Sequence, residues 1–197
     1  ATAPAAFPLF VKPRYEGTAK GIRPSSVVHD LASLQREVAH VHEAYQQDAL
    51  VEQFIQGGGE YTVAVVGHPP RALPKLERAV DPVTGIGSHA LERHGVEAWI
   101  LEGGIDAALE AEMQQMSLDV FGALGCRDFA RVDYRVDGNG TPWFLEINPL
   151  PTFAPDGTFA VLAELMGQPY PDWLSKVLDE ALNRALAEAG PNYVDHA

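Results

Sequence analysis

The sequence predicts an α+β fold, in which helices and short strands share one chain. Segments over 30–46, 106–124 and 172–189 place apolar residues three and four positions apart, as amphipathic helices do. Short β-branched runs bounded by Gly or Pro, such as 61–66, are typical of strands. With 197 residues and 46% hydrophobic content, the chain can also bury a substantial core.

The first part of the chain is expected to form a small lobe over residues 7–57. A strand over 9–11 leads into a mobile loop over 16–21, and Asp30 is a suitable N-cap for a helix ending near Gln46. The apolar face of this helix would comprise Leu31, Leu34, Val38, Val41 and Tyr45. A strand over 49–55 follows, and glycines 57–59 separate it from the run 61–66, which places a lobe boundary there.

The large lobe is expected over residues 58–190, with residues 1–6 and 191–197 as tails. Residues 69–104 show no clear periodicity, so no regular element is predicted in them. The helix over 106–124 has Leu109, Met113, Met116, Val120 and Leu124 on its apolar face and Gly125 at its end. The last helix, over 172–189, has an apolar stripe from Trp173 to Leu186 that should dock on the body.

A β-hairpin is predicted over residues 127–148, with Gly138-Asn139 as a two-residue loop. Counting from that loop sets Arg131 opposite Glu146 and Asp133 opposite Phe144, and residues opposite each other share a face. One face of the hairpin then carries Arg131, Asp133, Glu146 and Asn148, while the other is apolar.

The polar face of the hairpin has two interpretations. Asp133, Glu146 and Asn148 supply the oxygen ligands that Mg²⁺ prefers beside a nucleotide, and Arg131 adds a fixed cation. The alternative is an ordinary solvent-exposed face with one cross-strand ion pair, which would stabilise little.

Composition argues against several classes of protein. Lys and Arg number 14 against 27 Asp and Glu, and the net charge of -13 disfavours binding to nucleic acid. No apolar run is long enough to span a membrane. Cys126 is the single cysteine, and no signal peptide is evident, so we expect a cytoplasmic protein. The Ala- and Pro-containing start is typical of a linker or of a cut inside a longer protein.

Several short runs of the sequence follow one another in an order that indicates a protein family. They are FPLFVKP (7–13), EGTAKG (16–21), VEQFI (51–55), GEYTV (59–63), GCRDFARVD (125–133) and FLEINP (144–149). Together they resemble the successive motifs of the D-alanine:D-alanine ligase family over roughly residues 7–190. This resemblance implies an ATP-grasp fold, in which two lobes grip the nucleotide between them.

The resemblance also implies roles for individual residues. Lys12 would contact the ATP phosphates, and the loop 16–21 would close over them through Gly17, Thr18 and Ala19. The adenine would be bound by Glu52, Gln53, Phe54 and Ile55, and the ribose by Glu60. Asp133, Glu146 and Asn148 match the magnesium ligands, for two ions that Mn²⁺ could replace, and Arg131 matches the catalytic cation.

The implied reaction is ATP-dependent ligation of a carboxylate to an amine through an acyl phosphate. The alternatives are an ATP-grasp ligase of another branch, joining different amino acids or amines, and a nucleotide-binding fragment or pseudoenzyme without turnover. The expected partners are small amino acid or amine substrates and the family's amino-terminal domain, which this chain lacks; a homodimer stays open.

The chain departs from the family pattern at two places. A family lysine expected within 70–104 has Arg93 as a loose candidate. After Asn148 the family has a Ser/Thr-Pro-Gly run, whereas Thr152 and Phe153 follow Pro151 here. Because a β-branched threonine disfavours backbone conformations that glycine allows, we expect an acceptor other than D-alanine.

Overall fold

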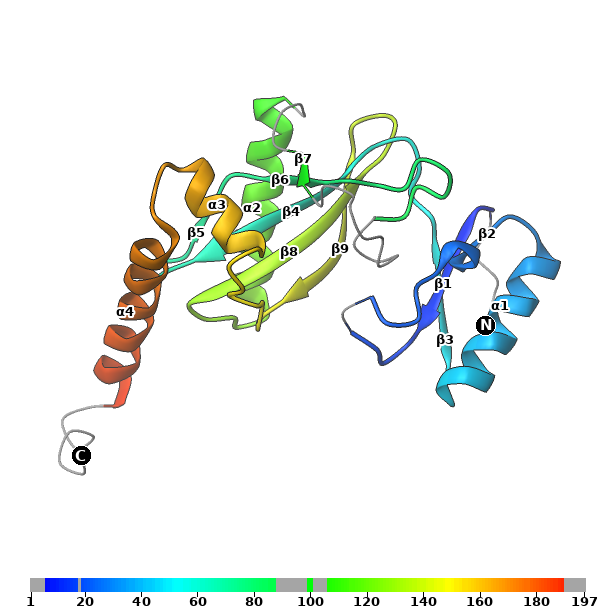
Figure 1. Cartoon of the computed structure of the whole chain (residues 1–197), viewed down its shortest axis with the longest axis horizontal. Coiled ribbons are helices and arrows are strands. Elements are labelled where there is room, and N and C mark those ends of the chain that lie inside the picture. Colours follow the sequence, from blue (N-terminus) through cyan, green and yellow to red (C-terminus); the bar gives the residue numbers. More distant parts are fainter. Residues whose placement is uncertain (1–5, 18, 88–98, 101–105, 190–197) are drawn as a thin grey trace. The chain divides into compact units, whose positions relative to one another are not determined.

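The structure is a computed structural model that describes residues 6–17, 19–87, 99–100 and 106–189 (Figure 1). Within these residues the chain divides into two compact units. Unit 1 comprises the described residues of Ala1–Glu60, Arg78–Ile100 and Val136–Thr141, and unit 2 comprises those of Tyr61–Glu77, Leu101–Arg135 and Pro142–Ala197. Each unit is described by itself below.

Unit 1 contains a three-stranded antiparallel sheet in the order β2-β1-β3 with a helix, α1, packed against it. The elements are β1 (Leu9–Pro13), the 3-10 helix η1 (Pro24–Ser26), β2 (Val27–Val28), α1 (Leu31–Tyr45) and β3 (Ala49–Gln53). Leu9 and Val11 on β1 are buried with Val28 and Val41, so alternate residues of β1 form the core. The intervening residues of β1, Phe10 and Lys12, therefore lie on the opposite face.

Helix α1 begins at the predicted N-cap, but its first apolar residue is not buried as predicted. The Asp30 carboxylate accepts a hydrogen bond from the Ser33 backbone N–H at 2.7 Å, which caps the helix. Leu31, expected on the apolar face, is exposed. Glu37 is buried instead, because Arg23 neutralises it with hydrogen bonds of 2.8 and 2.9 Å.

The strand predicted over 49–55 ends at Gln53 in the structure. Its partner β1 begins at Leu9, which pairs with Gln53, and the preceding residue is Pro8, which has no N–H to donate. Phe54 makes a last backbone hydrogen bond to the Pro8 carbonyl at 3.1 Å. Phe54 and Ile55 therefore follow the strand rather than belong to it.

The remaining elements form a larger sheet and three helices. The strands are β4 (Glu60–Val66), β5 (Arg71–Ala72), β6 (Leu76–Arg78), β7 (Trp99–Ile100), β8 (Phe129–Val136) and β9 (Pro142–Asn148), and the helices are α2 (Ala107–Ala123), α3 (Thr158–Leu165) and α4 (Tyr170–Ala189). The sheet order is β7-β6-β4-β8-β9, and β5 pairs with β4. The strands β5, β6 and β7 were not predicted, because two- and three-residue strands are too short to show a period. The eight-residue helix α3 was not predicted either.

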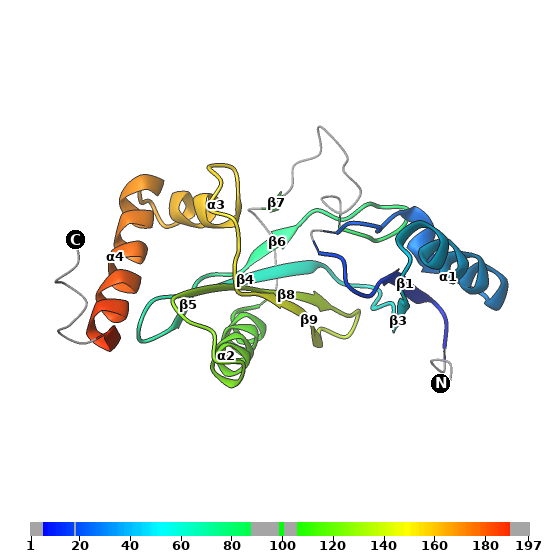
Figure 2. The ribbon, with the colours of Figure 1, turned by 90° about the horizontal axis from the view of Figure 1, so that it is seen from below.

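Helix α2 covers one face of this sheet, and Figure 2 shows α2 and α3 on opposite sides of it. Phe121 of α2 is buried in a cluster with Val65 of β4 and Ala130 of β8. The buried face of α2 is Met113, Ser117 and Phe121, so Met113 is a core residue as expected. Leu124, placed on that face by the sequence, is exposed, since the helix ends at Ala123 and the left-handed Gly125 turns the chain away.

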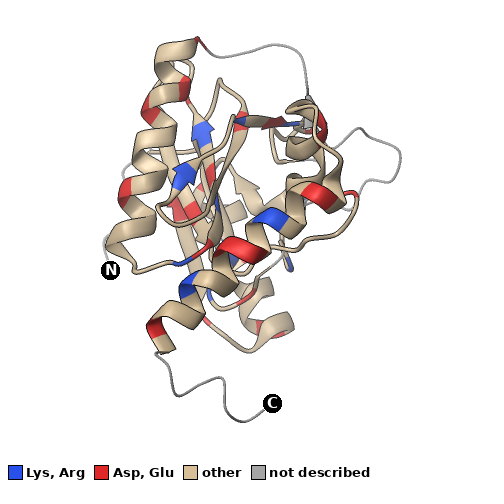
Figure 3. Ribbon diagram, turned by 90° about the vertical axis from the view of Figure 1, so that its left-hand side faces the viewer, with Lys and Arg blue, Asp and Glu red and all other residues tan. Residues whose placement is uncertain are grey.

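Helix α4 docks mainly through its first half. Trp173 and Val177 are buried, but Leu178, Leu182 and Leu186 are exposed, so the predicted apolar stripe is only partly covered. The second half contacts the body through ion pairs instead, namely Arg71 with Glu180, Asp128 with Arg184 and Arg127 with Glu188. Figure 3 shows acidic and basic residues along this helix, which leads to the C terminus.

The lengths and hydropathy of the helices in the described part of the chain can be compared with those that a membrane span needs. Each one is too short or too polar to cross a bilayer.

Candidate functional site

The polar face of unit 2 centres on Asp133 of β8. Arg131 binds its carboxylate with two charge-assisted hydrogen bonds, Nε to Oδ1 at 3.0 Å and a terminal guanidinium nitrogen to Oδ2 at 3.0 Å. The hydroxyl of Thr62 on β4 also donates to Oδ1. Arg131 and Asp133 are two residues apart on one strand, so they share a face. That face is opposite to the α2 side, where Tyr134 hydrogen-bonds Ser117.

The hairpin that carries these residues has a different turn from the predicted one. The Asp137 N–H donates to the Thr141 carbonyl at 3.0 Å, so residues 138–140 form the loop rather than Gly138-Asn139 alone. The Asp137 carboxylate accepts from the N–H groups of Asn139 and Thr141. Gly140 adopts φ 83°, a left-handed conformation that closes such a three-residue loop. The predicted two-residue register is therefore wrong at the turn.

Strand β9 contains a second irregularity, an interruption of its side-chain alternation between Phe144 and Ile147. Near the turn, the Phe144 ring contacts the Tyr134 ring, with centroids 6.4 Å apart, on the α2 side. Ile147 also packs on the α2 side, against the cluster of Ala130 and Phe121. Residues three apart cannot share a face of a regular strand, so the alternation of β9 is interrupted between Phe144 and Ile147, as at a β-bulge.

The interruption decides where the predicted metal ligands lie. Glu146 and Asn148 flank Ile147 in sequence and therefore project to the face opposite it, the face of Arg131 and Asp133. The Asn148 side-chain oxygen accepts a hydrogen bond from the Leu150 N–H at 3.0 Å, which orients the amide. Strand alternation from Ile147 thus assigns Glu146 and Asn148 to the face of Arg131 and Asp133, by a path that differs from the predicted register.

This donor set has the chemistry of a magnesium site beside a nucleotide. No three His, Cys, Asp or Glu side chains gather for metal binding anywhere in the described ranges. Mg²⁺ bound with phosphates takes only one or two carboxylates, and phosphate oxygens and water complete its shell. Asp133 and Glu146 supply two carboxylates and Asn148 an amide oxygen, and Asp133 already holds a cation in Arg131. These residues fit the ion.

In unit 1, Lys12 and Glu52 lie together on the face of the sheet that α1 does not cover. Lys12 Nζ is 2.7 Å from a carboxylate oxygen of Glu52. Lys12 pairs with Leu50 and Phe10 with Glu52, so their side chains share this face. The ring of Phe10 stacks on Phe54 at 5.9 Å between centroids. The predicted phosphate-binding and adenine-binding residues are thus neighbours.

The other predicted nucleotide contacts occupy loops and strand ends. In the loop 16–21, Glu16 pairs with Lys20 at 2.8 Å, and the hydrogen bond from Lys20 lowers the pKa of Glu16. The Lys20 N–H donates to the Gly17 carbonyl, and Ala19 adopts φ 59°. Gln53 is exposed at the end of β3, and Glu60 is buried at the start of β4. Thr18 and Arg93 lie outside the described residues.

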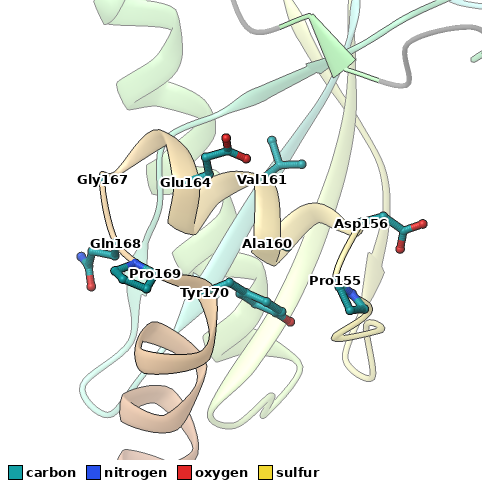
Figure 4. A pocket seen from close by; sticks show the side chains of 9 residues that line it. All are labelled: Pro155, Asp156, Ala160, Val161, Glu164, Gly167, Gln168, Pro169 and Tyr170. Atoms are coloured by element: carbon teal, nitrogen blue, oxygen red, sulfur yellow. The ribbon is translucent and has the colours of Figure 1, made fainter.

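The segment after Asn148 packs back on unit 2 through aromatic residues. The ring centroid of Phe153 lies 4.8 Å from that of Phe129 and 5.1 Å from that of Phe159. The Phe153 backbone carbonyl accepts a hydrogen bond from the Tyr170 hydroxyl at 2.7 Å. Tyr170 also lines a cavity of about 670 Å³ (Figure 4). Its lining, which includes Asp156 and Glu164, contains no Lys or Arg from the described chain. Phe153 thus anchors this segment.

Thr62 is the residue of the site that the sequence did not single out. A signal was present, because Thr62 is a hydroxyl residue inside the apolar run 61–66. Its β-branched side chain also favours a strand, so the sequence pattern does not separate it from the other strand-forming residues of this run.

Comparison with known proteins shows the family of the chain. Residues 2–179 match the family described as "D-ala D-ala ligase C-terminus". The chain belongs to that family. A D-alanine--D-alanine ligase of Burkholderia thailandensis is 33% identical over 178 residues, which are 89% of this chain and 54% of the relative. An uncharacterised protein of Sinorhizobium fredii is 34% identical over 188 residues, 90% of this chain and 53% of that protein.

A solved structure extends the comparison to three dimensions. The D-alanine--D-alanine ligase from Bacillus anthracis complexed with ATP has a TM-score of 0.65 and 26% identity, over 90% of this chain and 51% of that chain. The expected ATP-grasp fold and the resemblance to D-alanine:D-alanine ligases are therefore confirmed. The chain spans about half the length of the curated relatives it matches.

Proposed function

We propose that this chain is the ATP-binding and catalytic part of an ATP- and magnesium-dependent carboxylate-amine ligase. The observation that carries the proposal is the buried Asp133 carboxylate of β8, bound by Arg131 and Thr62, in a member of the D-Ala-D-Ala ligase family. An ordinary exposed face does not account for it, because Asp133 is buried and held by both Arg131 and Thr62.

The nucleotide would be bound mainly by residues that unit 1 supplies. Lys12 would give its point charge to the phosphates, and backbone N–H groups of residues 17–19 would complete their binding. Glu52 to Ile55 would bind adenine, for which the stacked Phe10 and Phe54 supply apolar surface, and Glu60 would bind the ribose hydroxyls. Lys12 must release Glu52 to reach a phosphate, and both groups are accessible enough to do so.

Asp133, Glu146 and Asn148 would hold magnesium, in two sites that Mn²⁺ could also occupy. The bound ions would screen the phosphate charges during phosphoryl transfer. Arg131 would stabilise the negative charge that develops on the transferred group, since a planar guanidinium binds phosphoryl oxygens through several N–H groups.

The proposed reaction has two steps. A carboxylate oxygen of the first substrate attacks the γ-phosphorus of ATP, which forms an acyl phosphate and releases ADP. The amine of the second substrate then attacks the acyl carbon, the amide bond forms, and phosphate and a proton leave. Thr152 stands where the family has glycine, so we propose an acceptor other than D-alanine.

Binding and turnover are tested separately. Adenine nucleotide with Mg²⁺ should raise the melting temperature of the chain, because a ligand selective for the native state stabilises it. Phosphate release should then be measured across D- and L-amino acids and small amines, on the complete gene product whatever its length. Absence of a thermal shift at millimolar nucleotide would refute the site. A shift without phosphate release for any substrate would identify a binding protein instead of a ligase.

A further inference from the structure

The hydroxyl of Thr62 is a buried polar group aimed at the proposed metal ligand Asp133. The Thr62 side chain is fully buried on β4, and its Oγ1 donates to Asp133 Oδ1. The backbone on which it sits is held between β6 and β8 in the sheet. Valine would fill the same volume in this strand, so shape alone does not call for a hydroxyl.

Arg131 contacts the same carboxylate, but its side chain is longer and more exposed than that of Thr62. Its guanidinium spans both oxygens of Asp133, at 3.0 Å to each. A cation that binds Asp133 competes with this guanidinium for the lone pairs of the two oxygens. Arg131 can give way, because its long side chain pivots about several bonds and is 18% exposed. Thr62 cannot, because it is short and buried in a central strand.

We propose that Thr62 is a positioning residue, which holds the Asp133 carboxylate in its metal-binding orientation while Arg131 exchanges for the cation. The inference rests on the proposed function, since metal ligation by Asp133 belongs to it. Groups that hydrogen-bond a ligating carboxylate fix its orientation, and losing one typically costs about 10- to 100-fold in metal affinity.

The test uses variants that separate the hydroxyl from the volume of the side chain. Thr62→Val removes the hydroxyl and keeps the shape, whereas Thr62→Ser keeps the hydroxyl. The matched control is Ser117→Ala, which removes another fully buried hydroxyl that bonds Tyr134 at 2.8 Å on the opposite face of β8. Mn²⁺ affinity is measured by electron paramagnetic resonance with a non-hydrolysable ATP analogue, and melting temperature is recorded without ligand.

Thr62→Val should weaken Mn²⁺ binding about 10-fold or more. Thr62→Ser should keep the wild-type affinity, and Ser117→Ala should lower the melting temperature and leave the affinity unchanged. Affinity for the nucleotide without metal should be equal in all four proteins. Should Thr62→Val fail to fold, Thr62→Ala replaces it in the same comparison.

Unchanged Mn²⁺ affinity in folded Thr62→Val or Thr62→Ala would overturn the inference and leave the proposed function intact. An equal loss in Ser117→Ala would also overturn it, since the effect would then follow stability. Absence of Mn²⁺ binding by the wild-type protein with nucleotide would instead refute the metal site itself, and the role of Thr62 with it.

Discussion

Arg184 of α4 holds Asp128 through two hydrogen bonds, Nε to Oδ1 at 2.6 Å and a terminal nitrogen to Oδ2 at 2.8 Å. Asp128 adopts φ 65°, a left-handed conformation that is unusual for a residue other than glycine, one position before β8 begins. The contact therefore joins the last helix to the strand that carries Arg131 and Asp133. Both side chains are largely buried, at 13% and 14% exposed.

We expect Arg184→Ala to lower the free energy of unfolding, because it leaves the Asp128 carboxylate without its charged donor. Arg127→Ala is the control, since it removes an exposed partner of Glu188 and should lower the free energy of unfolding less. Urea denaturation of the three proteins compares the two losses. Equal losses in the two variants would show that α4 depends on total charge rather than on this contact.

Two glycines should respond to alanine in opposite directions. A Cβ atom added at Gly58 would lie 1.7 Å from the carbonyl oxygen of Val136, within unit 1, where the neighbouring Gly59 carbonyl accepts from the Val136 N–H. Backbone would have to move, so Gly58→Ala should destabilise by roughly 2 kcal/mol or more. Gly122 lies in α2 with open space around it, so Gly122→Ala should stabilise by about 0.5–1 kcal/mol.

Thermal and urea unfolding of both glycine variants test this contrast. A Gly58→Ala protein as stable as the wild type would show that residues 56–59 and the hairpin tip separate readily.

Tyr134 should give the protein an alkaline sensitivity. Burial raises the pKa of Tyr134 from its ordinary value of 10.0 to about 12. Because the folded state favours the neutral phenol, its contribution is complete below pH 10 and is lost as the pH rises from 10 through 12. Tyr134→Phe cannot ionise there, so its stability should fall less over this range.

At pH 7 the same variant should be less stable by about 1 kcal/mol, since the hydrogen bond to Ser117 is lost. Urea unfolding between pH 7 and 11.5 measures both effects. Tyr15→Phe is the control, because it removes the same hydroxyl from an exposed tyrosine. Parallel profiles for Tyr134→Phe and the wild type would contradict the assignment.

Glu146→Gln should weaken metal-dependent nucleotide binding while the protein stays folded. The change keeps the shape of the side chain and removes the charge that a hard cation prefers. Nucleotide affinity measured by calorimetry with Mg²⁺ should fall about 10-fold or more, while affinity without metal stays the same. An unaltered dependence on magnesium would remove Glu146 from the proposed ligands.

Local sequence patterns determined the elements with strong periodicity or caps. Asp30 and Asp106 begin their helices as predicted, and the run after Gly59 forms a strand, because capping and side-chain alternation depend on nearby residues. The order of the motifs also identified the family, since the motifs contain the residues that are expected to bind the nucleotide and the metal.

Tertiary structure decided the features that depend on distant partners. β3 ends where Pro8 leaves it without a donor, and α4 exposes Leu182 because ion pairs, rather than its leucines, attach its second half. The hairpin register needed both the three-residue turn and the interruption near Ile147, which a count of residues does not reveal. In the sequence, Thr62 is not distinguished from the other β-branched residues of its strand. Its hydroxyl reaches Asp133 only because β4 pairs with β8 in the sheet.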